Sequence, residues 1–217
     1  MTLNLASEQL DLAEYSQLQV QLIRNASPKG FGANHNAAFE HCQTQQFVVV
    51  NPDIRLPDRT ALVRLLQGDS SNRVGLRAPL VTNSVGLRED SVRRHLTPWS
   101  LIRRALGHDR EPLRPRMPAK KGAPFFWLAG MFMVLDSQAF REVGGFDERF
   151  FLYCEDYDLC ARLYVAGYSI VLNEQVSVVH DAQRDSHRSA KHLRWHLSSL
   201  GKVWFSSAFW RVLMTSR

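Results

Sequence analysis

A carboxylate follows directly on the apolar run of residues 47–50, in the sequence Asn51-Pro52-Asp53. Pro52 has no backbone N–H, so it ends a strand ladder and stiffens the turn from which the Asp53 side chain projects. Parallel α/β sheets bind their ligands outside the carboxyl ends of the strands, which is where Asn51 and Asp53 fall. The pattern indicates a ligand-facing carboxylate, and a turn that merely ends the strand is the alternative.

Three further acids crowd the first turn of a predicted helix that runs from Glu155 to a stop at Gly167. The helix dipole favours negative charge there, so Glu155, Asp156 and Asp158 could simply cap the helix. Three acids in four residues exceed what a cap requires, however, and an aromatic run precedes them. Carboxylates beside an apolar wall have raised pKa values, which suits a general base.

Hydrophobic periodicity predicts the elements that position these acids. Strands are expected at residues 20–24, 47–50, 73–81 and 125–135, and helices at 8–17, 34–42, 59–66, 98–106, 137–143 and from 155. A strand, a helix and a strand at the spacing of the first two strands favour a parallel α/β sheet. The run 125–135 contains Ala129 and Gly130, small residues that indicate a core strand passing close to a ligand.

The composition describes an ordinary globular protein. The 217 residues are 45% hydrophobic, enough for a core without covalent staples. The three cysteines lack metal-ligand spacing, which favours reduced thiols. The first twenty residues do not have the pattern of a secretory signal, so we expect a cytoplasmic protein. We predict one domain over residues 1–185 and an amphipathic, basic helical tail over residues 186–217.

Positive charge is concentrated in two segments. The net charge is +6, and basic residues gather between Arg88 and Lys121 and again in the tail. In the tail Leu193, Leu197, Leu200 and Trp204 share one helical face. This composition is typical of a helix lying on an anionic membrane surface, and a helix packed on the domain is the alternative. A nucleic-acid-binding module is a weaker hypothesis, because few aromatics interleave with the basic run and no binding motif occurs.

Several motifs, taken in order, resemble the family 2 glycosyltransferases of GT-A fold. They are the loop GFGANHN at 30–36, NPDI at 51–54, WLAG at 127–130, GGFD at 144–147, YCEDYDLC at 153–160, and His180. The likeness covers residues 12 to 204 and is closest to bacterial rhamnosyltransferases that assemble O-antigen and related polysaccharides. It implies a Rossmann-like α/β domain with a mixed, mostly parallel sheet flanked by helices.

The resemblance also implies roles for individual residues. Asp53 occupies the acidic motif that holds Mg²⁺ or Mn²⁺ against the diphosphate of a nucleotide sugar, and His180 supplies a further metal contact. Asp156 aligns with the base that takes the acceptor proton, and Glu155 competes for that role. Donor contacts are expected from Gly30, Gly32, Asn34, Asn51 and Asp53, and acceptor contacts from Trp127, Gly130 and Asp147.

The implied reaction is an inverting transfer of rhamnose from dTDP-rhamnose to a lipid-linked saccharide, at the inner face of the cell membrane. The family begins with a strand, a helix and a second strand ending in an Asp-Asn-Gly-Ser type of turn. Nothing before Leu12 resembles that unit. We therefore expect an N-terminally truncated domain, and an inactive remnant, or a chain completed by a partner or by a homo-oligomer, stays open as the alternative.

Overall fold

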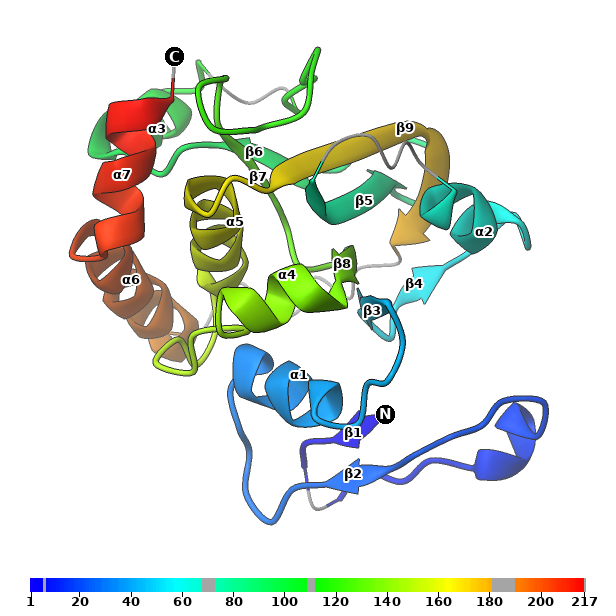
Figure 1. Ribbon diagram of the computed structural model, residues 1–217. Coiled ribbons are helices and arrows are strands. Elements are labelled where there is room, and N and C mark those ends of the chain that lie inside the picture. Colours follow the sequence, from blue (N-terminus) through cyan, green and yellow to red (C-terminus); the bar gives the residue numbers. More distant parts are fainter. Residues whose placement is uncertain (6, 68–72, 109–111, 181–189, 217) are drawn as a thin grey trace.

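The computed structural model of the protein describes residues 1–5, 7–67, 73–108, 112–180 and 190–216. Its centre is a mixed five-stranded sheet in the order β3-β8-β5-β9-β4 (Figure 1). The strands are β3 (Gln46–Val50), β4 (Ile54–Arg55), β5 (Val74–Thr82), β8 (Phe132–Asp136) and β9 (Ser169–His180). β5 and β9 run parallel, and the other neighbours in this sheet are antiparallel. A mixed α/β sheet with flanking helices is therefore confirmed. Within this sheet only the β5–β9 pair is parallel, and β2 (Ile23–Arg24) does not pair with β3 in the way expected from their spacing.

Two small sheets lie beside the central one. β1 (Thr2–Leu3) pairs in parallel with β2 (Ile23–Arg24), and β6 (Val92–Arg94) pairs antiparallel with β7 (Phe126–Leu128). The strand predicted at 20–24 is thus short, and its hydrogen-bonded neighbour is β1. Two residues are too few to show a period, which is why β1 escapes prediction from sequence.

The helix predicted over residues 8–17 is wrong, because only a 3₁₀ turn forms there, at Leu12–Tyr15. The Glu8 carboxylate accepts the backbone N–H groups of Asn4 (2.6 Å) and Leu5 (3.0 Å). Acidic side chains that bind nearby backbone donors offer the chain an alternative to helix, and turns result.

The single strand predicted over residues 125–135 is also wrong. The segment forms β7 and β8, which belong to different sheets. Between them, Gly130 N–H donates to the Asp156 side chain and leaves the strand ladder. A side chain from a distant element has here replaced a strand partner, which no local pattern reveals.

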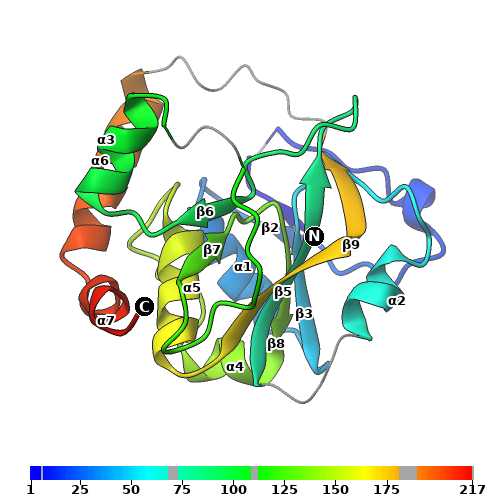
Figure 2. The same cartoon turned by 90° about the horizontal axis from the view of Figure 1, so that it is seen from above.

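Seven helices surround the sheets in the described chain: α1 (Phe31–Phe39), α2 (Ala61–Leu66), α3 (Pro98–Ala105), α4 (Ser137–Glu142), α5 (Glu155–Val165), α6 (Ala190–Trp204) and α7 (Ser207–Thr215). α4 and α5 lie on one side of the central sheet and α2 on the other (Figures 1 and 2). Successive residues of β8 face opposite sides, so Met133 and Leu135 join the main core while Phe132 and Val134 join a smaller one with α2.

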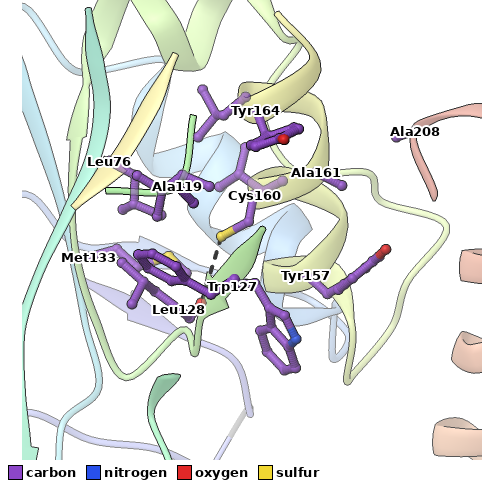
Figure 3. Close-up of a cluster of buried hydrophobic side chains, with 14 of the residues drawn as sticks. Leu76, Ala119, Trp127, Leu128, Met133, Tyr157, Cys160, Ala161, Tyr164 and Ala208 are labelled. Atoms are coloured by element: carbon purple, nitrogen blue, oxygen red, sulfur yellow. Dashed lines mark hydrogen bonds between the residues drawn. The ribbon is translucent and has the colours of Figure 1, made fainter. Parts of the chain in front are cut away.

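The main core fills the space between α5 and the strands. Figure 3 shows Tyr157, Cys160 and Tyr164 of α5 with Trp127 and Leu128 of β7, all almost inaccessible to solvent. Cys160 Sγ lies 3.9 Å from the Leu128 carbonyl oxygen. The position of α5, and with it that of the acids in its first turn, is set by this packing.

The C-terminal helices complete the same core. Leu200 and Val203 of α6 and Phe209 and Val212 of α7 are buried in it, and α7 packs on α5. The predicted domain boundary after residue 185 falls within 181–189, outside the described residues. No helix in the described part of the chain has the length and apolar content needed to cross a bilayer.

Glycine allows α1 to lie against the loop that precedes α5. A Cβ on Gly30 would stand 2.7 Å from the Phe151 carbonyl oxygen, and one on Gly32 would stand 2.7 Å from the Phe146 Cβ. Phe31 N–H donates to that same Phe151 oxygen at 3.0 Å. Both glycines are therefore required by close approach of the chain.

We expect Gly30→Ala to lower the free energy of unfolding by about 2 kcal/mol, because the backbone contact leaves no room for a methyl group. Gly201→Ala is the matched control, since a Cβ at that position in α6 meets nothing within 4 Å. The control should raise stability by about 0.5 kcal/mol through helix propensity. Urea denaturation of both variants measures the difference, and equal effects would contradict the packing argument.

Candidate functional site

The backbone between β7 and β8, here called the 129–131 junction, joins the elements that carry the candidate residues. Its three residues each form a hydrogen bond to a different element: Ala129 N–H to Ser91 O (2.8 Å), Gly130 N–H to Asp156 Oδ2 (3.0 Å), and Met131 O from Asn51 N–H (3.0 Å). The end of β3, the chain entering β6 and the start of α5 therefore meet at one place.

Glu155 and Asp156 open α5 in different surroundings. Asp156 accepts the backbone N–H groups of Gly130 (3.0 Å) and Tyr157 (2.8 Å). Glu155 is 5% exposed, and its Oε2 has no hydrogen-bond partner among the described residues. Burial, together with the nearby Asp156 charge, raises the pKa of Glu155 to about 8. Burial also raises the pKa of Asp156, and Arg93 opposes that rise. The pair suits proton transfer near neutral pH.

The turn before α5 is strained. Tyr153 and Cys154 have φ angles of 73° and 66°, a left-handed conformation that costs each non-glycine residue about 1 kcal/mol. The Tyr153 hydroxyl lies 2.8 Å from His192 Nδ1 of α6. Cys154 is buried in the core. These contacts hold the strained turn and direct the first residues of α5 toward the 129–131 junction.

Arg93 and Trp127 form the wall beside Asp156. The Arg93 guanidinium lies 5.1 Å from the centre of the Trp127 ring, and its Nε donates to Asp90 Oδ2 at 3.0 Å. Trp127 is only 3% exposed, and its Nε1 donates to the Arg94 carbonyl oxygen at 2.8 Å. The proposed acceptor contact of Trp127 stays a prediction, and what the geometry provides is a buried ring that supports a cation.

The other acids of this region are ion-paired. Asp158 is buried and accepts from Arg162 Nε at 2.7 Å, one helical turn away. Asp147 pairs with Arg149 at 2.6 Å within a single turn, and Arg149 holds the pKa of Asp147 below its usual value. Asp158 is therefore structural, while the acceptor role of Asp147 stays a prediction.

Asp53 and His180, far apart in sequence, lie side by side. β4 pairs with the end of β9 so that Ile54 stands opposite His180. His180 Nε2 is 3.2 Å from Asp53 Oδ2, and His180 Nδ1 is 2.7 Å from Glu89 Oε2. A neutral imidazole has one N–H and can donate to only one of these carboxylates. The second contact therefore lacks a donor hydrogen of its own unless a further proton or a cation lies between the two atoms.

These side chains fit a divalent cation that is bound in part from outside the chain. Asp53 Oδ1 is buried without a partner among the described residues, and carboxylate oxygen with imidazole nitrogen suits Mn²⁺ or Mg²⁺. No group of three His, Cys, Asp or Glu side chains in the described residues could hold a metal ion. Two protein ligands leave other positions for phosphate oxygens and water.

Asparagines join the parallel pair β1–β2 to α1. Asn25 Nδ2 donates to Asn4 Oδ1 (2.9 Å) and to Asn34 Oδ1 (2.7 Å), and Asn4 Oδ1 also accepts from Lys29 N–H (2.8 Å). Both strands end here, at the edge where α/β sheets bind ligands. The donor contacts expected from Asn34 and Gly30 stay predictions.

Known proteins are similar to this chain in sequence and in fold. Residues 116–216 match the model of the family described as Glycosyl transferase family group 2. The rhamnosyltransferase WbbL of Escherichia coli K12 is 28% identical over 180 residues, which cover 78% of this chain and 68% of WbbL. The N-acetylglucosaminyl-diphospho-decaprenol L-rhamnosyltransferase of Mycobacterium tuberculosis is 32% identical over 163 residues, which cover 70% of this chain and 52% of that enzyme.

The chain resembles the family 2 glycosyltransferases in sequence. Two solved structures share its GT-A fold. GalNAc-T7 with UDP, GalNAc and Mn²⁺ has a TM-score of 0.60 at 15% identity over 91% of this chain and 39% of its own. The mannosyltransferase PcManGT of Pyrobaculum calidifontis with GDP-Man and Mn²⁺ has a TM-score of 0.56 at 17% identity over 88% of this chain and 49% of its own.

The chain spans about two thirds of WbbL and about half of the mycobacterial enzyme. The predicted resemblance to this family, and within it to rhamnosyltransferases, is confirmed. The fold class is confirmed as well.

Sequence reasoning does not identify Glu89 and Arg93 as site residues. Both lie in the segment from Arg88 to Lys121, whose most evident feature is its positive charge. Their roles depend on contacts with His180 and Trp127, residues distant in sequence. The adjacent acids Glu89 and Asp90 at the start of this basic segment are the only local sign of such a role, and the net charge of the segment does not reveal them.

We expect Glu155→Gln to stabilise the fold by about 2 kcal/mol at pH 8. Glu155 is ionised in the unfolded chain above about pH 4.5 but stays protonated in the folded chain up to about pH 8, so stability is lost as pH rises through this window. Glutamine is neutral throughout, so its advantage should shrink toward pH 4.5.

The matched variant Asp158→Asn should instead destabilise by about 2 kcal/mol, since it removes the buried partner of Arg162. Urea unfolding at pH 8 and at pH 5 distinguishes the two. A Glu155→Gln protein less stable than the wild type at pH 8 would contradict the assigned environment.

Proposed function

We propose that this chain is an inverting glycosyltransferase domain that transfers rhamnose from dTDP-rhamnose to a lipid-linked saccharide at the inner face of the cell membrane. One observation carries the proposal: the 129–131 junction joins the raised-pKa pair Glu155–Asp156 to the strand end that bears Asp53. The choice of rhamnose and of a lipid-linked acceptor is supported by the two rhamnosyltransferase relatives, one of which is named for a diphospho-decaprenol acceptor.

In the proposed reaction, Asp156 takes the proton from the acceptor hydroxyl as that oxygen forms a bond to the anomeric carbon of the donor. The bond between the anomeric carbon and the phosphate oxygen breaks, and dTDP leaves with the electron pair. Burial raises the pKa of Asp156, which makes it a stronger base, and the nearby positive charge of Arg93 limits that rise. Glu155, beside it in the first turn of α5, is 5% exposed.

Asp53 and His180 would hold a divalent cation, which neutralises charge on the leaving diphosphate when it is bound. Mn²⁺ is named with both structural relatives, PcManGT and GalNAc-T7. Glu89 lies 2.7 Å from His180 Nδ1, and with a cation at Nε2 it would accept the proton on Nδ1 and hold the ring in place. Glu89 is thus a positioning residue for this site.

Donor binding is tested by thermal unfolding of the purified chain with dTDP, UDP or GDP, each with and without Mn²⁺, because a ligand bound only by the folded state raises the midpoint. We expect dTDP with Mn²⁺ to raise the unfolding midpoint of the wild type, and Asp53→Ala to abolish this rise. Glu89→Gln should lower the affinity for Mn²⁺ by about tenfold. Asp58→Ala removes a surface carboxylate paired with Arg64 and should leave the rise intact.

A cooperatively folded chain with no nucleotide-dependent rise would contradict the proposal and favour the inactive or partner-completed alternative. A rise of the unfolding midpoint with UDP or GDP but not with dTDP would support the glycosyltransferase activity and contradict dTDP-rhamnose as the donor.

For the chemical step, we expect Asp156→Asn to lower turnover by about a hundredfold or more, because general bases contribute at least that much. The thermal rise with dTDP and Mn²⁺ should be unchanged, since Asp156 does not contact the donor in this scheme. Rhamnose transfer to a synthetic lipid-linked acceptor measures turnover. Loss of donor binding and of stability together would show that Asp156 only holds Gly130.

A further inference from the structure

The helix α3 presents an open apolar face. Trp99, Ile102 and Leu106 are 65%, 49% and 68% exposed, and their spacing places them on one side of the helix and its end. None of the residues of α3 is buried. Apolar side chains gathered in this way on a protein surface indicate a contact with something outside the chain.

Helices α6 and α7 have apolar outer faces as well, opposite the residues that they bury in the core. Their exposed members are Leu193 (62%), Leu197 (60%), Trp210 (53%), Leu213 (46%) and Met214 (74%), and Phe205 (93%) lies between the two helices. The side chains that fill the core on the inner faces are different ones, so core packing does not explain these residues.

The three helices lie together at one end of the molecule, here called the three-helix end. In both views α3, α6 and α7 occupy the same end, with α5 between them and the central sheet (Figures 1 and 2). Trp204 Nε1 at the end of α6 donates to the Leu96 carbonyl oxygen, just before α3, at 2.8 Å. The exposed apolar residues are therefore carried by neighbouring elements.

The charged residues within the three helices are all basic, and Arg104 of α3 is paired with Asp90. The sequences of α3, α6 and α7 contain no Asp or Glu and hold six basic residues: Arg103, Arg104, Lys191, Arg194, Lys202 and Arg211. Arg194 and Arg211 are exposed. Basic side chains interspersed with exposed tryptophan, phenylalanine and leucine are the composition of surfaces that bind the headgroup layer of a membrane.

We propose that the three-helix end docks on a lipid bilayer containing anionic lipids, with its apolar side chains in the headgroup layer. Charge complementarity selects this occupant, because three helices whose charged residues are all basic repel a second copy of themselves. Each basic side chain near an anionic membrane strengthens binding by about fivefold, and the apolar residues add to it.

Docking in this way would bring the acids of α5 close to lipid. His192 of α6 contacts the Tyr153 hydroxyl, two residues before Glu155. The inference deepens the proposed function, on which its biological purpose rests, because a lipid-linked acceptor would arrive from the same surface. Bilayer binding itself is measurable without donor or acceptor.

The test is cosedimentation of the purified chain with vesicles of phosphatidylcholine alone and of phosphatidylcholine mixed with phosphatidylglycerol, at low and high salt. We expect binding to the mixed vesicles, weaker binding at high salt, and a blue shift of tryptophan fluorescence that is reduced in Trp99→Phe and Trp210→Phe. Failure to sediment with either kind of vesicle overturns the proposal.

Two variants and a control localise the surface. Ile102→Ser with Leu213→Ser should weaken binding about tenfold, and Arg194→Gln with Arg211→Gln should remove most of the preference for anionic vesicles. Val85→Ser with Leu87→Ser is the matched control, since these residues are 75% and 65% exposed in the turn after β5. Equal losses in the control and in the apolar variant overturn the proposal.

Other outcomes separate the two proposals. Vesicle binding without a nucleotide-dependent rise of the unfolding midpoint supports the docking surface and contradicts the glycosyltransferase activity. A nucleotide-dependent rise without vesicle binding supports the activity and overturns the docking surface. A dimer in sedimentation equilibrium that the Ile102→Ser with Leu213→Ser variant dissociates, with no vesicle binding, assigns the three-helix end to self-association and overturns docking on lipid.

Discussion

The structure depends on the backbone hydrogen bonds of the 129–131 junction. Buried backbone groups must find partners, and here they find them on three different elements: the chain before β6, the start of α5 and the end of β3. Since none of these partners is local, the junction forms only when the whole domain is assembled. It is also where the site residues meet, so the packing that satisfies the backbone is the packing that builds the site.

Burial then decides what the acids can do. The first turn of α5 carries three carboxylates in different surroundings. Asp158 is ion-paired with Arg162, and Asp156 accepts backbone N–H groups. Glu155 has an oxygen without a hydrogen-bond partner among the described residues. A helix N-terminus stabilises negative charge in general, but it does not distinguish among neighbouring residues. The distinction comes from the core around Trp127 and from the strained turn before α5, whose cost is consistent with a functional role.

The C-terminal helices serve two sides of the molecule. Val203 and Val212 are fully buried, while Leu197 and Met214 on the same helices are exposed. The inner face closes the core over α5 and holds Tyr153 through His192. The outer face, together with α3, supplies the surface proposed to bind lipid, so that packing and docking use opposite stripes of the same helices.

The sequence by itself determined the periodic elements, such as α5 and β5, the family resemblance, and the presence of a carboxylate after β3. These follow from local patterns of apolar residues and from motifs in a fixed order. Only the tertiary structure decided that residues 125–135 form two strands, that Glu89 contacts His180, and that Asp156 binds Gly130. The physical reason is that a hydrogen bond across a long stretch of chain depends on burial and geometry, which no short window of sequence contains.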